Sequence, residues 1–257
     1  MRIAIHKTAA LVTSMACISG SCSSVPKLLP HVARLELREQ IQKASLVVVG
    51  IVEDERAVVR VAAESKEELI PLELRAVRIR VEGVLEGRFD GKELTFYYYQ
   101  ATGAWDGSPI NILSPQERDI FFLVKDGGVL RAPADVYLSH TRVLTGKHHV
   151  SRVVSKDLVP TAIARLLLVP GDEAEVQKDL ALWRRSLAVA LSLVPQAQVV
   201  QILQNDLESS NSEVRGRVCL LLADFPLKEK GCLLSVVNDR RVPQEDRKRA
   251  QELMDQD

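Results

Sequence analysis

The chain has 257 residues, of which 46% are hydrophobic and 26% charged, and it carries 34 basic and 34 acidic side chains. This composition is ordinary for a folded globular protein and excludes an intrinsically disordered chain. The lack of a basic excess argues against a nucleic-acid or membrane-surface module. No apolar run reaches the roughly 20 residues that a transmembrane helix needs.

The first 22 residues have the three-part pattern of a secretory signal peptide. Arg2 and Lys7 are basic, residues 8–18 are mostly apolar, and residues 19–24 are small, with a cysteine at position 22. We therefore expect segment 1–22 to direct export to the periplasm, to the outer envelope or to the medium.

The end of this segment leaves two alternatives for the mature protein. Ser19-Gly20-Ser21-Cys22 resembles the end of a bacterial lipoprotein signal, although Ser19 stands where that family prefers leucine. The resemblance implies lipidation of Cys22 and a membrane anchor, with residues 23–34 as a tether. Plain cleavage and release is the alternative.

Residues 35–150 have the pattern of a small β domain that begins with a short helix over residues 35–44. Strands are indicated by β-branched or alternating apolar residues over 46–52, 58–61, 72–85, 93–99, 119–124, 129–132 and 136–143. The alternation changes phase at Ala76–Val77, which predicts a β-bulge there. Asp126-Gly127-Gly128 predicts a tight hairpin.

This strand pattern predicts a small Greek-key barrel of the OB type. The segments KASLVVVGIVED, VRIRVEGVLEGRFDGKELTFYYY and RDIFFLVKDGGVLR resemble the netrin-like domain of the tissue inhibitors of metalloproteinases. The resemblance implies an OB-type fold and, as a function, protease inhibition. The cysteines that pin the inhibitory edge in that family are missing, because none lies between Cys22 and Cys219.

Residues 155–257 have helical periodicity and repeat themselves. WRRSLAVALSLVP at 183–195 aligns with VRGRVCLLLADFP at 214–226 and with DRKRAQELM at 246–254. NSEVRGRVCLLLADF resembles the second helix of a HEAT repeat, which implies a helical solenoid. The alignment predicts two sets of equivalent side chains. A buried row would comprise Leu187, Leu191, Val218 and Leu222, and an arginine ridge Arg184, Arg215 and Arg247.

The whole chain is therefore predicted to be an α+β multidomain protein, with an OB-like barrel followed by a HEAT-like solenoid. The change of periodicity between residues 145 and 157 predicts two separate cores. We expect fragments 30–150 and 151–257 to fold independently.

No catalytic motif is found, and no catalytic residue, cofactor or metal is predicted. His140, His148 and His149 with Asp135 have the residue types of a zinc site, but a solvated linker explains them better. The aromatic run Tyr97–Tyr99 and Trp105, with Arg78 and Arg80 nearby, has the composition of a nucleic-acid platform. Packing explains the run better, and a partner protein is the expected ligand. The protein-binding candidates are Trp105, Tyr97, Tyr99, Arg184, Arg215 and Arg247.

Cys219 and Cys232 fall at similar distances from a helix turn, so a disulfide and two free thiols are alternatives. Gly231 beside Cys232 would permit the close approach that a disulfide needs.

The leading functional hypothesis is a non-enzymatic interaction or scaffold protein of the cell envelope. A secreted protease inhibitor or regulator of the netrin-like type is one alternative, and an enzyme with an unrecognised site is another.

Overall fold

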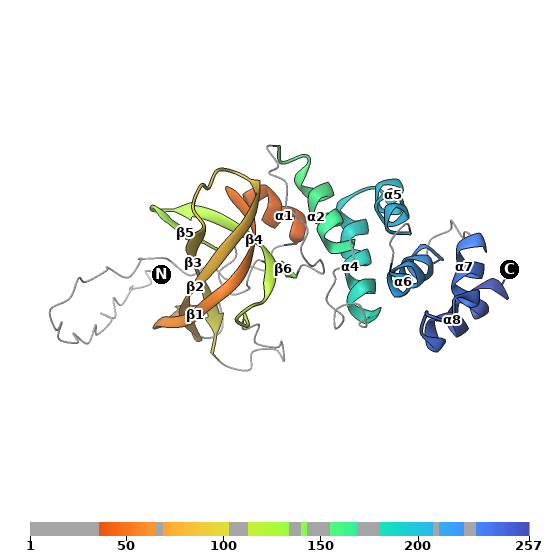
Figure 1. The fold of residues 1–257 in the computed structure, drawn as a ribbon. Helices are drawn as coiled ribbons and strands as arrows, with labels where there is room; N and C mark the ends of the chain where they lie inside the picture. Colours follow the sequence, from red (N-terminus) through yellow and green to blue (C-terminus); the bar gives the residue numbers. More distant parts are fainter. Residues whose placement is uncertain are drawn as a thin grey trace, which may run out of the picture.

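The structure is a computed structural model that describes most of the chain beyond residue 35. The described residues are 36–64, 69–102, 113–133, 140–142, 155–168, 180–207, 211–223 and 230–256. Within them the fold is α+β, with a mixed sheet on the N-terminal side and a row of helices on the C-terminal side (Figure 1).

The sheet has six strands in the described part of the chain. They are β1 (Leu46–Glu64), β2 (Leu69–Glu86), β3 (Glu93–Ala101), β4 (Arg118–Asp126), β5 (Val129–Arg131) and β6 (His140–Arg142). Their order is β1-β2-β3-β5-β4-β6, and β4 also pairs with β1. The pairings of five strands therefore form a closed circuit. β3 and β5 run parallel, whereas the other neighbours are antiparallel.

The tight turn between β4 and β5 is where the sequence predicts it. Gly127 and Gly128 have φ values of 55° and 90°, in the left-handed region that glycine adopts without steric cost. The predicted hairpin at Asp126-Gly127-Gly128 is confirmed.

The predicted bulge at Ala76–Val77 is wrong. The register of β2 against β3 is unbroken from Leu72 to Arg80. Against β1, the extra residues of β2 are Glu82 and Leu85, and those nearest to Ala76–Val77 belong to β1, at Glu53 and Val58. Ala76 and Val77 are both buried although they point to opposite faces. The phase of the sequence changes because the buried face of β2 changes there.

β1 and β4 are apolar on both faces because each face belongs to a different core. Val48 and Phe121 lie in a cluster with residues of β2 and β3. Val47, Val49 and Phe122 lie in a second cluster that includes α1 and the helices after residue 158. The expectation of two separate cores is therefore wrong, since this second cluster crosses from the sheet into the helical row.

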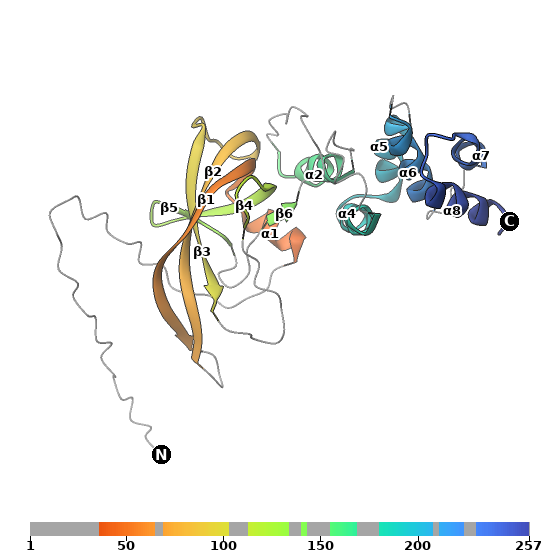
Figure 2. The same cartoon turned by 60° about the horizontal axis from the view of Figure 1, so that its bottom comes forward.

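Seven helices occur in the described residues. They are α1 (Leu37–Lys43), α2 (Val159–Leu168), α4 (Leu180–Leu193), α5 (Gln196–Asp206), α6 (Ser212–Ala223), α7 (Lys230–Asn238) and α8 (Gln244–Met254). α2 contacts α4 and α5, α4 contacts α5 and α6, and α6 contacts α5, α7 and α8. In Figure 2 the helices follow one another away from the sheet, and α7 and α8 lie at the far end.

Helix α1 is bonded to the helical row at both of its ends. Arg38 donates from Nε to the carbonyl oxygen of Ser192 at 2.8 Å, at the C-terminus of α4. Lys156 donates from Nζ to the carbonyl oxygens of Gln42 at 3.0 Å and Ala44 at 2.7 Å, at the C-terminus of α1. Basic side chains at helix C-termini satisfy carbonyls that lack an intrahelical donor and favour the helix dipole.

We expect Gly50→Ala to destabilise the protein by about 1–3 kcal/mol, as overpacking usually does. Gly50 pairs with Val81 of β2 and Asp119 of β4, and an added Cβ would lie 2.8 Å from the carbonyl oxygen of Arg80. Urea unfolding followed by circular dichroism measures the loss. Gly231→Ala is the control, because a Cβ there meets nothing within 4 Å. Equal stability of the two variants would contradict the role given to Gly50.

Candidate functional site

The aromatic run of β3 is largely internal. Tyr98 and Tyr99 are each 2% exposed, whereas Tyr97 is half-buried and its carbonyl accepts a hydrogen bond from the amide of Ala132 at 2.9 Å. Trp105 lies outside the described residues. Of the aromatic binding candidates, only Tyr97 is therefore seen to reach the surface, and only in part.

The basic residues of β2 are neutralised by their neighbours. Glu53 lies 3.5 Å from Arg78 and 3.8 Å from Arg80, and Glu82 forms an ion pair with Arg118 at 2.5 Å. Arginines that alternate with acidic partners do not form the positive groove that a nucleic-acid backbone requires.

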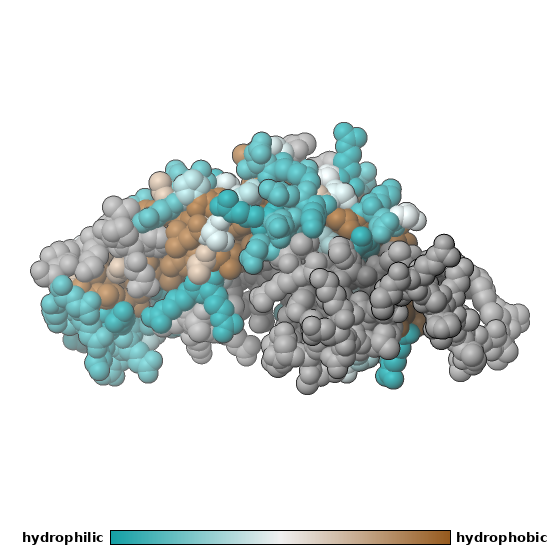
Figure 3. Space-filling model, turned by 180° about the vertical axis from the view of Figure 1, so that it is seen from behind, coloured by the Kyte–Doolittle hydropathy of each residue, from teal (hydrophilic) through white to brown (hydrophobic). Residues whose placement is uncertain are grey.

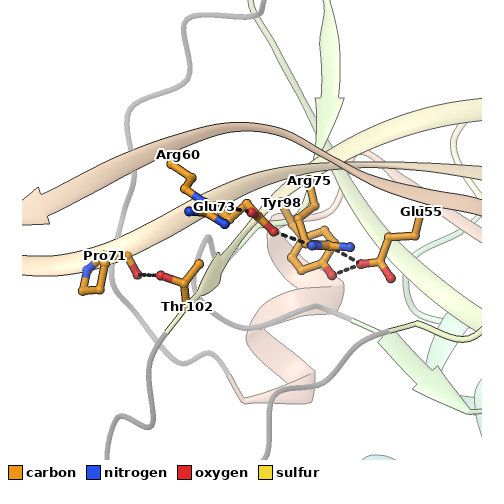
Figure 4. A network of polar contacts seen from close by, with 7 residues as sticks. All are labelled: Glu55, Arg60, Pro71, Glu73, Arg75, Tyr98 and Thr102. Carbon is orange, nitrogen blue, oxygen red and sulfur yellow. Dashed lines mark hydrogen bonds and ion pairs between the residues drawn. The ribbon is translucent and has the colours of Figure 1, made fainter.

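A polar network joins β1, β2 and β3 (Figure 4). The hydroxyl of Tyr98 donates to Oε1 of Glu55, and Nε of Arg75 donates to the same oxygen at 3.0 Å. Nη1 of Arg75 reaches Oε2 of Glu73 at 2.5 Å, and Arg60 approaches Oε1 of Glu73 at 3.5 Å. The network brings together residues from three strands that are distant in sequence.

The network runs from the interior to the surface. The side chain of Glu55 is 4% exposed, that of Arg75 16% and that of Arg60 84%. The charges of the four ionisable partners Glu55, Glu73, Arg60 and Arg75 cancel. Because the inner carboxylate has a cation beside it, its burial is tolerated.

The electrostatics keep Tyr98 neutral and Arg75 charged. Burial raises the pKa of Tyr98 far above its ordinary value, and the hydrogen bond to Glu55 adds to the shift. Burial lowers the pKa of Arg75, but the attraction of Glu55 and the hydrogen bonds to Glu55 and Glu73 outweigh it, so the net shift is upward.

One atom of the network has no hydrogen-bond partner. Oε2 of Glu55 is buried, and no donor among the described residues reaches it. The other oxygen accepts two donors, so the carboxylate is held on one side only. The arrangement clamps three strands.

We expect Tyr98→Phe to lower the free energy of unfolding by about 1.5–3 kcal/mol, because a buried carboxylate loses one of its two donors. The raised pKa of Tyr98 means that the contribution of this phenol is complete below its unfolded pKa of 10.0 and decreases above it. Urea unfolding at pH 8 and pH 11 measures both effects.

Tyr97→Phe is the matched control, since no hydrogen bond of its hydroxyl is found in the described structure. It should change stability by no more than about 0.5 kcal/mol. A similar loss from both variants would mean that the hydroxyl of Tyr98 is not held by Glu55.

The three arginines at equivalent repeat positions have different surroundings. Arg184 on α4 is exposed. Arg215 on α6 is partly buried and forms an ion pair with Asp239 at 3.5 Å. Arg247 on α8 is partly buried, and its Nε has no hydrogen-bond partner among the described residues.

The buried row predicted from the repeat is correct at three positions and wrong at one. Leu187, Val218 and Leu222 are buried, but Leu191 is 38% exposed. Ala190 and Leu193 take the buried places near the end of α4. In α4 the buried positions therefore differ from those that the repeat alignment predicts.

Cys219 on α6 and Cys232 on α7 form a disulfide with a Cα–Cα distance of 5.7 Å. Gly231 does not explain the short distance, because a Cβ there would meet nothing within 4 Å. The close approach lies at Gly216 of α6, where an added Cβ would be 3.0 Å from Cγ1 of Val242. Because Gly216 has no side chain, α6 can lie close to Val242 in the turn between α7 and α8.

The remaining candidates lie mostly outside the described residues. This is the case for Cys22, His148, His149 and Asp135, and of His140 only the backbone is described. Among the described residues, no three His, Cys, Asp or Glu side chains are placed to hold a metal ion. In the same part of the chain, no helix is both long and apolar enough to cross a membrane.

Comparison with known protein families and with curated proteins finds no match. The functional interpretation therefore depends on the geometry.

Proposed function

We propose that the chain is a non-enzymatic, exported interaction protein of the cell envelope. In this proposal an OB-type barrel carries a HEAT-like helical solenoid, and the solenoid binds a partner protein. The proposal has three parts, which are supported by different observations.

The strand pairings support an OB-type barrel. The circuit β1-β2-β3-β5-β4-β1 contains one parallel pair, between β3 and β5. The extra residues of β1 at Glu53 and Val58 bend a long strand, as closure of a small barrel requires.

The contacts between successive helices support the proposed binding function. α4, α6 and α8 contain the aligned repeat segments, and α4 contacts α6, which contacts α8. α5 and α7 connect them. A stack in which each helix pair contacts the next presents an extended surface to a partner. Figure 3 shows a band of apolar residues along the helical part, which is on the left in that view.

Two features support export. Residues 1–22 have the pattern of a signal peptide. The second feature is the Cys219–Cys232 disulfide, because disulfides form and persist mainly in oxidising compartments. Mass spectrometry of the native protein tests this part. We expect a mature N-terminus at or near Cys22, and a diacylglyceryl adduct there would decide for the lipoprotein. Retention of Met1 in the native host would contradict export.

Site-specific photo-crosslinking in the native host tests the binding function. A photoreactive amino acid replaces Arg184 or Leu191, which are exposed on α4, or Lys125, which is exposed on β4 as the control. We expect a discrete crosslinked species from the α4 positions and none from Lys125. Absence of crosslinks at all three positions, or equal crosslinking at each, would contradict a binding surface on the solenoid.

Protease inhibition is the second candidate, and one observation favours it. The closed circuit of strands fits the OB-type fold that the resemblance to the netrin-like domain implies. Titration of a zinc endopeptidase with the purified protein tests this candidate. Stoichiometric loss of peptidase activity would support it, and unchanged activity at a large excess would eliminate it for that enzyme.

A further inference from the structure

Helices α7 and α8 pack on α6 through a hydrophobic cluster that is separate from the large cluster shared with the sheet. The cluster contains Cys219, Leu220 and Ala223 of α6, Leu233 and Val236 of α7, Val242 of the turn, and Ala250 and Leu253 of α8. The opposite face of α6 belongs to the large cluster shared with the sheet. Helix α6 is therefore the boundary of the end unit α7–α8, which Figure 1 places farthest from the sheet.

Few apolar side chains hold α8. Only Ala250 and Leu253 are buried apolar residues of this helix, and its third buried residue is Asp246. Because apolar burial is the main source of stability, a helix with so little of it opens more readily than the helices nearer the sheet.

The buried ion pair between α6 and α8 adds little to this attachment. Nε of Arg217 lies 3.7 Å from Oδ2 of Asp246, which is longer than a hydrogen bond. Nε and Nη1 of Arg217 and Oδ2 of Asp246 have no hydrogen-bond partner in the described part of the chain. Burial raises the pKa of Asp246, and the attraction of Arg217 only partly offsets this shift.

The disulfide is the strong attachment of the end unit. It joins α6 to α7 inside the cluster, and its two cysteines are 13 positions apart. Cys219 is 3% exposed, whereas Cys232 is half-buried. Cys232 is therefore the more accessible of the two cysteines to a thiol in solution.

We propose that the Cys219–Cys232 disulfide is a redox latch, which holds the α7–α8 unit on α6 and is opened by a dithiol reductant of the Cys-x-x-Cys class. Opening exposes the face of α6 that carries Leu220 and Ala223. The proposal does not depend on the partner-binding function, because it concerns a change within the chain.

The chemistry is thiol–disulfide exchange. A thiolate of the reductant attacks Sγ of Cys232, a mixed disulfide forms, and Cys219 leaves as a thiolate that takes up a proton. The second thiolate of the reductant then attacks the first sulfur of the reductant, which is bonded to Sγ of Cys232. The reductant's own disulfide forms, and Cys232 leaves as a thiolate that takes up a proton. Two electrons pass from the reductant to the cysteine pair, and the reductant becomes a disulfide.

Amide hydrogen exchange of the full chain, with and without dithiothreitol, tests the latch. We expect exchange in residues 230–254 to become about 100-fold faster on reduction, the factor that corresponds to release of a loop of about 15 residues. Exchange in α2 and α4 should not change, and reoxidation should restore the original rates.

The double variant Cys219→Ser/Cys232→Ser should exchange as the reduced protein does, with no response to dithiothreitol. If that variant does not fold, alkylation of the reduced wild type replaces it, and Cys219 should react with iodoacetamide under native conditions. Unchanged exchange in residues 230–254 on reduction would overturn the proposal. Equal acceleration in all helices would overturn it too, because the latch would then not be local.

Discussion

Replacing Phe122 by alanine should destabilise the strands and helix α2 together, by about 3–5 kcal/mol. Phe122 is fully buried on β4, and its cluster contains Val47 of β1 as well as Val159 and Ile163 of α2. Amide hydrogen exchange should therefore become faster in α2 as well as in β1 and β4.

Phe121→Ala is the matched control, because it removes the same side chain from the opposite face of the same strand. Phe121 is also fully buried, but its cluster contains strand residues and no residue of α2. We expect a similar total loss, with a smaller effect on α2. Unchanged exchange in α2 in the Phe122 variant would mean that the two parts are independent.

Replacing Leu222 by alanine should cost about 2–5 kcal/mol, the usual range for a buried leucine, whereas Leu191→Ala should cost less than about 1 kcal/mol. The two residues are equivalent in the repeat, but Leu222 is 2% exposed and Leu191 is 38% exposed. Thermal and urea unfolding of the full chain compare them. Equal losses would indicate that both leucines face the core, as the repeat alone predicts.

Periodicity predicted most strands and helices, since it reports which face of an element is buried. It could not predict the shared core. Residues 46–52 form an apolar run with one glycine and no polar residue, so the sequence does not tell which of Val47 and Val48 faces the helices. That assignment depends on which elements cover each face of β1, and the covering helices lie more than a hundred residues further along the chain.

The polar network was not predicted either. Glu55, Arg75 and Tyr98 come from three strands, and the extra residues of β1 at Glu53 and Val58 shift the register that aligns them. A cross-strand contact requires knowledge of register, which one sequence does not contain. The cysteine pair could be proposed from the sequence, because Cys219 and Cys232 are at similar distances from the turn predicted at Phe225-Pro226.

The bonds of helix α1 affect the order in which the protein can fold. Arg38 is 154 residues from Ser192, to which it donates, so its partner is synthesised much later. At typical rates of about 5–20 residues per second, this interval is roughly 10–30 s. During that time the strands lack the helices that cover Val47 and Phe122. Completion of the core around Val47 and Phe122 therefore has to wait until α4 has been synthesised.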